Sequence, residues 1–243
     1  MRAASLVWYR LRWPREVTAE QITQAFRLLA SAAGSPIVLE TVGSAGMVEH
    51  RLALPSGRAG SLVDQLRASV PGLALEQARS RPVLVATRAV ELRMTTRRRP
   101  LRTDDMTSVT RATLTGLAHV QRGERLTLQW VLGHPLAPVA VPNHLEAFSR
   151  ESWIGALLVA PFSAPKPVDV EVRNALRMKQ SEPGWRATAR IAVKAKSAKR
   201  ERQLVRQVVG ALANAEAPGV GLRVRTISPR RVISATAGWR VPL

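Results

Sequence analysis

The stretch WRATARIAVKA, residues 185–195, carries the clearest secondary-structure pattern in the chain. Its side chains alternate between two faces, which is the period-two pattern of a strand that packs one face against a core. Ser197 follows as a helix cap, because a serine oxygen can accept from the free backbone N–H groups of the first turn. One face holds Trp185, Ala187, Ala189, Ile191 and Val193, and the other holds Arg186, Thr188, Arg190 and Lys194.

Strands and helices alternate in a regular order around this stretch. Upstream, residues 88–95 and 125–132 alternate as strands, and a helix that Thr103 caps lies between them. Downstream of the helix that begins after Ser197, residues 221–227 alternate as a further strand. The order is therefore β-α-β-β-α-β, which is the ferredoxin-like pattern.

The first 80 residues repeat this order. Residues 6–13 alternate as a strand, and Thr18 and Gln21 have the spacing of a capping box at a helix start. Two strands around a Gly-Ser-Ala-Gly turn, a short helix and a last strand follow. We therefore expect an α+β fold with two ferredoxin-like β-α-β-β-α-β units, residues 1–80 and residues 83–232.

Two further segments complete the expected organisation. Within the second unit, residues 133–183 form an insertion that is Pro-rich at its start and contains two short helical patches. Residues 233–243 are expected to form a C-terminal tail that leads to a domain missing from this sequence.

The charge of the chain is its most unusual property. Lys and Arg number 37 against 17 Asp and Glu, which gives a formal net charge of +20. A surplus of this size favours a polyanionic partner, although a genome that encodes arginine in place of lysine accounts for part of it. The segment 184–243 holds thirteen of the basic residues and two acidic ones, so we expect a polyanion to bind the second half.

Composition also limits the compartment and the chemistry. The chain contains no cysteine, which removes disulfides, thiolate metal sites and cysteine nucleophiles. The N-terminus lacks the unbroken apolar run of a signal peptide, and the longest apolar stretch, residues 153–162, is too short to span a bilayer. We expect a cytoplasmic protein, held at the inner face of the membrane only through partners.

The sequence shows no catalytic motif. The phosphate loop G-x-x-x-x-G-K-[ST], the dinucleotide fingerprint G-x-G-x-x-G and the G-x-S-x-G nucleophile elbow are all absent. None of the four histidines has the helical spacing of a metal site. We therefore predict a protein without catalytic residues, metal ligands, cofactors or a small-molecule substrate.

The run RMTTRRRPLRTDD, residues 93–105, is the first candidate site. Arginines beside a helix N-terminus suit a phosphate group, since both are positive. The alternative is a solvated turn in which Asp104 and Asp105 occupy the helix end and pair with the arginines. The candidate anion contacts in this run are Arg97, Arg98, Arg99 and Arg102.

The second candidate set is Arg186, Arg190 and Lys194, on the polar face of the opening strand. RNA-recognition modules use such a sheet face, but they stack bases on aromatic side chains there. This face offers arginines without aromatics, so it favours contact with the phosphate backbone. The alternative is that these side chains pair with acids of another subunit or domain.

Several stretches together resemble a known family. They are VWYRLRWPREV near the start, ELRMTTRRRPLRTDD after the first unit, LTLQWVLGHPLAP, residues 175–212 with "Pro-Gly-aromatic" before the strand, and EAPGVGLRVRTISPRR near the end. Over almost the whole chain, the sequence resembles the N-terminal region of actinobacterial type IV secretion and conjugative DNA-transfer ATPases, the motors related to coupling proteins, VirB-type and HerA-like motors.

The resemblance implies a specific role. In that family an ATPase domain with a phosphate loop follows this region, and this chain holds no such loop, so no ATPase residue can be assigned. The resemblance thus implies a non-catalytic module for assembly, docking and possible contact with DNA. Its expected partners are DNA, the secretion machinery or the missing ATPase domain, and a second copy of the chain. The alternatives are a stand-alone nucleic-acid-binding protein and a structural scaffold that does not bind DNA.

Overall fold

The computed structural model describes residues 5–32, 36–79, 84–96, 101–136, 174 and 184–235. Most of the expected insertion at 133–183, and the expected tail from 236 onward, lie outside these residues. The elements of the first half are β1 (Leu6–Arg12), α1 (Ala19–Ala32), β2 (Ile37–Ser44), β3 (Met47–Pro55), α2 (Ala59–Ser69) and β4 (Ala74–Gln77). Those of the second half are β5 (Arg88–Met94), α3 (Met106–Ala118), β6 (Arg125–Leu136), β7 (Gly184–Lys194), α6 (Ala198–Ala213), β8 (Leu222–Ile227) and α7 (Pro229–Ile233).

The eight described strands form one antiparallel sheet in the order β4-β1-β3-β2-β6-β7-β5-β8. Each half contributes four neighbouring strands, and the two sets follow the same connection order from opposite edges. The halves join where β2 pairs with β6, over a register that runs from Ile37 opposite Leu132 to Gly43 opposite Leu126. The predicted mixed α+β class is confirmed, and the two halves share one sheet.

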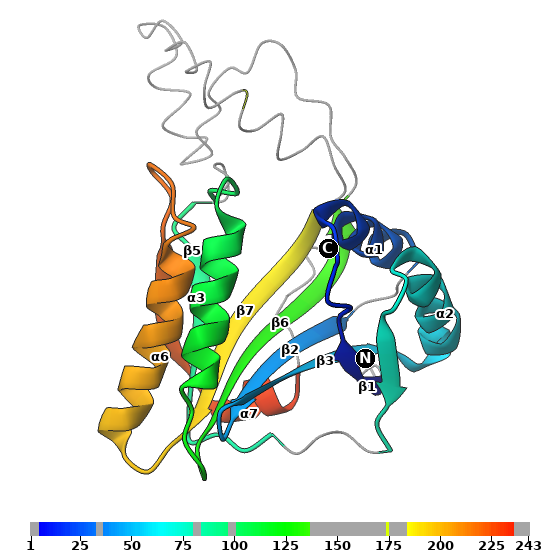
Figure 1. Cartoon of the computed structure of the whole chain (residues 1–243). Helices are drawn as coiled ribbons and strands as arrows, with labels where there is room; N and C mark the ends of the chain where they lie inside the picture. Colours follow the sequence, from blue (N-terminus) through cyan, green and yellow to red (C-terminus); the bar gives the residue numbers. More distant parts are fainter. Residues whose placement is uncertain are drawn as a thin grey trace, which may run out of the picture.

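Four helices cover one face of this sheet. Figure 1 shows α3 and α6 side by side as one pair and α1 and α2 as another. Leu132 of β6 belongs to the core under α1 and α2, whereas Leu126 and Leu128 belong to the core under α3 and α6. These three leucines alternate with the buried residues of the opposite face, so both helix pairs lie on the same side.

The opposite face is covered by shorter segments. Val232 of α7 and Leu84 pack on Ala89 and Ala192 of the second half. Ala235 packs with a second group of buried side chains that includes Trp8, Val38, Ala53 and Val131. Along the described strands, the face away from the four helices is therefore partly covered rather than fully open to solvent.

The helix starts follow from short polar motifs. The capping box is confirmed: the Thr18 N–H donates to Gln21 Oε1 at 2.9 Å, and the Gln21 N–H donates to Thr18 Oγ1 at 3.2 Å. The cap at Ser197 is confirmed too, through the Arg200 N–H at 3.2 Å. The cap of α3 is Asp105, which accepts from the Ser108 N–H, and not Thr103.

The later start of α3 has a visible cause. The Arg102 N–H donates to the Ala215 carbonyl at 2.8 Å, so the chain just before α3 is bound to the end of α6. That contact belongs to the chain just before Asp105, the residue whose side chain caps the helix. A pattern within residues 103–105 could not reveal a contact with a residue more than a hundred positions away.

Gly43 allows α3 to approach the sheet. A Cβ atom at this position of β2 would lie 2.0 Å from the carbonyl oxygen of Leu117, which belongs to the helix backbone. Real Cβ contacts do not come below 3.0 Å. Hydrogen is therefore the only side chain that fits between β2 and α3 here.

The half-buried His50 of β3 makes stability depend on pH. Burial lowers the pKa of this imidazole, and its Nδ1 lies 3.1 Å from Thr41 Oγ1. In the unfolded chain the His50 imidazole binds a proton below the ordinary histidine pKa of about 6.5, whereas in the folded chain it does so only at lower pH. Stability should therefore fall as pH drops through about 6.5 toward the lower pKa of the folded state. We expect His50→Asn to weaken this slope in urea unfolding.

Candidate functional site

A row of polar side chains crosses the whole sheet on the face opposite the four helices. One residue of each strand lies directly opposite the next in the antiparallel register, so the side chains of the row point to the same face. We call this set the transverse row. In sheet order it consists of Glu76, Arg10, Arg51, Glu40, Gln129, Arg190, Glu91 and Arg225.

The centre of the transverse row is buried. Glu40 is 3% exposed, and Gln129 and Arg190 are fully buried. The Gln129 amide donates to Glu40 Oε1 at 2.8 Å, and Arg51 Nη1 lies 3.9 Å from Glu40 Oε2. Buried polar groups are costly unless they are paired. The row therefore holds β3, β2 and β6 together by polar contacts inside an otherwise apolar interior.

Arg190 and Glu91 form the corresponding pair on β7 and β5. Arg190 Nε lies 3.6 Å from Glu91 Oε2. This Nε has no hydrogen-bond partner among the described residues, so the attraction here is ionic. Burial lowers the pKa of Arg190, and the Glu91 carboxylate acts in the opposite direction. Glu91 Oε1 also accepts a hydrogen bond from Nε of the more exposed Arg93 at 2.9 Å.

Helix α7 packs on the transverse row, on the sheet face opposite the four helices. Arg190 Nη1 donates to the Arg231 carbonyl at 2.9 Å, and the Gln129 amide donates to the Val232 carbonyl at 2.9 Å. The last carbonyls of a helix have no partner within the helix and carry partial negative charge. Side-chain donors from β6 and β7 thus bind the end of α7 to the second half of the sheet. The first half is connected to this contact only indirectly, through the hydrogen bond from Gln129 to Glu40 of β2.

The second candidate set is divided by this arrangement. Arg190 is fully buried under α7 and is not exposed, as the sequence pattern had suggested it would be. The pattern could not reveal this burial, because the sequence of a polar strand face is the same whether or not a helix covers it. Arg186 is half-buried, and Lys194 at the end of β7 is exposed. The three side chains therefore do not form one open surface.

For the first candidate set, the structure describes one arginine of the four. Arg97, Arg98 and Arg99 lie outside the described residues. Arg102 is exposed, and its Nη2 donates to Asp104 Oδ2 at 2.8 Å. This hydrogen bond holds the pKa of Asp104 below its ordinary value. At Arg102 the contacts match a turn in which an aspartate pairs with arginine.

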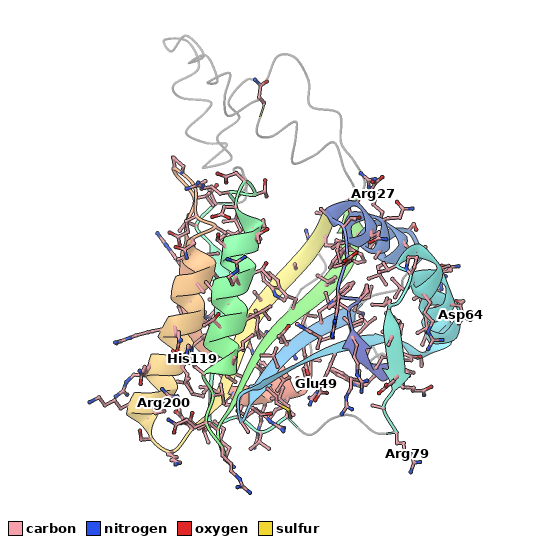
Figure 2. All side chains as sticks on the ribbon, in the orientation of Figure 1. Arg27, Glu49, Asp64, Arg79, His119 and Arg200 are labelled. Atoms are coloured by element: carbon pink, nitrogen blue, oxygen red, sulfur yellow. The ribbon has the colours of Figure 1, made fainter. Side chains whose placement is uncertain are left out.

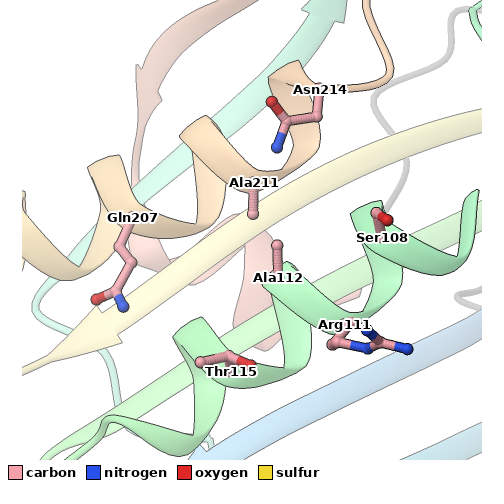
Figure 3. A pocket seen from close by; sticks show the side chains of 7 residues that line it. All are labelled: Ser108, Arg111, Ala112, Thr115, Gln207, Ala211 and Asn214. Atoms are coloured by element: carbon pink, nitrogen blue, oxygen red, sulfur yellow. The ribbon is translucent and has the colours of Figure 1, made fainter. Parts of the chain in front are cut away.

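An open groove of about 480 Å³ lies on the outer side of α3 and α6 (Figure 3). Its one charged side chain is Arg111, so it brings no acid and base together. The lining residues are Ser108, Arg111, Ala112, Thr115, Gln207, Ala211 and Asn214. Among the described residues, no three His, Asp or Glu side chains cluster as metal ligands would. None of the helices that the structure describes has the length and apolar character of a membrane span.

Comparison with known proteins identifies no family. No protein-family model matches the sequence, and no curated protein is significantly similar to it. A solved structure of an unknown protein from Galdieria sulphuraria aligns over 93% of this chain and 99% of that chain, with 17% identity and a TM-score of 0.23. A TM-score this low carries no argument about fold or function.

Proposed function

We propose that this chain is a non-catalytic N-terminal module of a conjugative DNA-transfer ATPase of a type IV secretion system. Its role is assembly and docking, together with contact to DNA. The resembling stretches of sequence support the family, and the charge of +20 supports contact with a polyanion. The module acts in the cytoplasm and reaches the inner face of the membrane through its partners. Those partners are the secretion machinery, the ATPase domain and further copies of the chain.

We also propose that each half is a ferredoxin-like unit. The strand order β4-β1-β3-β2 in the first half supports this, and β8-β5-β7-β6 in the second half is its counterpart. In both halves two helices pack on the same face of the sheet. The units would then be joined edge to edge through β2 and β6, with the proposed insertion between β6 and β7.

One observation carries the assembly role: the docking of α7 on the transverse row. Through Arg190 and Gln129, the last described helix is bound to β7 and β6, two neighbouring strands of the second half. Such an arrangement would fix the orientation of anything joined to the C-terminal side of α7. A module that positions an attached or docked motor needs this kind of rigid connection.

Removal of the chain from donor cells tests this proposal. Plasmid transfer should be lost when the segment that encodes residues 1–243 is deleted in frame, and should return when the wild-type chain is supplied. Purified chain should show no ATPase activity of its own, with the motor domain as a positive control. Normal transfer from the deleted strain would rule the proposal out.

A stand-alone nucleic-acid-binding protein is the second candidate, favoured by the concentration of basic residues in the second half. It predicts unimpaired transfer from the deleted strain together with salt-sensitive binding of nucleic acid by the purified chain. The two measurements therefore separate the candidates.

A further inference from the structure

Five exposed cations gather at one end of the second half, where β7 leads into α6. We call them the basic end; they are Arg122, Lys194, Lys196, Lys199 and Arg202. They come from three elements: the turn after α3, the end of β7 with the loop that follows it, and the first turns of α6. Within the described part of the chain, none of these five side chains is in a salt bridge.

Contacts of Arg200 bring these elements together. Arg200 Nε donates to Glu124 Oε1 at 3.1 Å, and Arg200 Nη2 donates to the His119 carbonyl at 3.1 Å. The turn that contains Arg122 is thereby bound to the first turn of α6. Figure 2 shows Arg200 and His119 near one another at this end. Lys194 lies opposite Arg125 in the sheet register, so the end of β7 adjoins the same turn.

The acidic residues of this region are already paired with other arginines. Burial alone would raise the pKa of Glu124, but the hydrogen bonds from Arg200 and the Gln121 N–H, together with the charges of Arg200 and Lys196, outweigh it and the pKa is lowered. Glu201 is buried toward β5, where it accepts from Thr87 and lies 3.3 Å from Arg88 Nε. Within the described residues, both carboxylates thus form their ion pairs with other arginines, and of the five cations only Lys196 contributes to the lowered pKa of Glu124, by a weak charge–charge attraction.

The local structure does not account for these cations. Lys196 and Lys199 stand at the start of α6, where the helix itself carries partial positive charge, so their position is unfavourable for the isolated fold. An external anion would relieve this mutual repulsion. The cations belong to several elements, and the anion that fits them is a chain of charges rather than a single ion.

We propose that the basic end binds the sugar-phosphate backbone of DNA; this inference rests on the proposed function. No aromatic side chain belongs to the basic end, so it offers no surface for base stacking. Contact with phosphates alone carries no sequence information. Binding is therefore independent of sequence, occurs with single- and double-stranded DNA, and weakens steeply as salt rises.

Fluorescence anisotropy with a labelled oligonucleotide over a salt series tests this inference. The variant Lys196→Gln/Lys199→Gln/Arg202→Gln should bind at least about tenfold more weakly, and its log–log salt slope should fall by about 2–3, roughly one for each lost phosphate contact. The matched control is Arg15→Gln/Arg79→Gln/Arg223→Gln, which removes the same net charge at exposed positions elsewhere. The control should stay close to wild type.

Equal losses in both variants would show that net charge alone attracts DNA, and would overturn the inference. Wild-type binding by the basic-end variant, or no binding of DNA by the wild-type chain, would overturn it as well. So would binding of anionic phosphatidylserine vesicles in place of DNA. Urea midpoints of both variants should match wild type, which excludes misfolding as the cause of a loss.

The transfer assay keeps this inference separate from the proposed function. If transfer requires the chain, but the basic-end variant supports transfer and binds DNA as the wild type does, then the DNA-binding role of the basic end alone is refuted. If the chain binds DNA through the basic end, but plasmid transfer does not require the chain, then the conjugation role alone is refuted.

Discussion

Replacement of Arg190 by alanine should lower the free energy of unfolding by about 3–5 kcal/mol, the usual cost of removing one partner from a buried ion pair. The substitution leaves the Glu91 carboxylate, which is 7% exposed, without its buried cation. It also removes the donor to the Arg231 carbonyl at the end of α7. Urea unfolding followed by circular dichroism measures the change.

Arg93→Ala is the matched control, because Arg93 contacts the same carboxylate from a half-exposed position. An exposed partner contributes less than about 1 kcal/mol, so this variant should unfold close to wild type. A second variant, Arg190→Met with Glu91→Leu, removes both charges and should recover part of the loss. Equal effects of Arg190→Ala and Arg93→Ala would contradict the burial of the transverse row under α7.

Replacement of Gly43 by alanine should cost about 3 kcal/mol or more, at or above the upper end of the usual range for overpacking. The added Cβ would meet the Leu117 carbonyl oxygen at 2.0 Å. Both groups belong to backbone, so neither can move away by a change of rotamer. Either α3 or β2 must shift, and the core between them loses contact. A lower urea midpoint and a lower melting temperature should both report this change.

Gly210→Ala is the control with the opposite expected sign. Gly210 lies in α6, is exposed, and has no atom within 4 Å of an added Cβ. Alanine favours a helix over glycine by about 1 kcal/mol, so this variant should be more stable than wild type. If Gly43→Ala were neutral or stabilising, the close approach of α3 to β2 would be refuted.

Local patterns predicted the elements of this fold well. Alternation over residues 185–195 predicted β7, and the Thr18–Gln21 motif predicted the start of α1, because both signals lie within a few residues. The pairing of β2 with β6 is different, since it joins residues about ninety positions apart through backbone groups that any sequence supplies. Sequence reasoning therefore predicted two separate units and did not predict the continuous sheet.

The candidate site was harder to predict, for a related reason. The five residues of α7 show no period of their own, so nothing in the sequence indicated that this helix covers Arg190. A useful signal was present nonetheless. Glu40 and Glu91 interrupt apolar strands, and an acid in the middle of such a strand indicates a buried arginine opposite it. The cations of the basic end come from three elements, and only folding brings them together.

The register between β2 and β6 has a consequence for symmetry. Seven residue pairs join these strands, and Glu40 with Gln129 is the middle pair. In a symmetric dimer of identical units the same residue would occupy both positions, because an isologous interface places each residue opposite its own copy at the axis. Two glutamates there would repel each other. A single chain with two non-identical halves avoids this restriction, and one half can supply the carboxylate while the other supplies the amide donor.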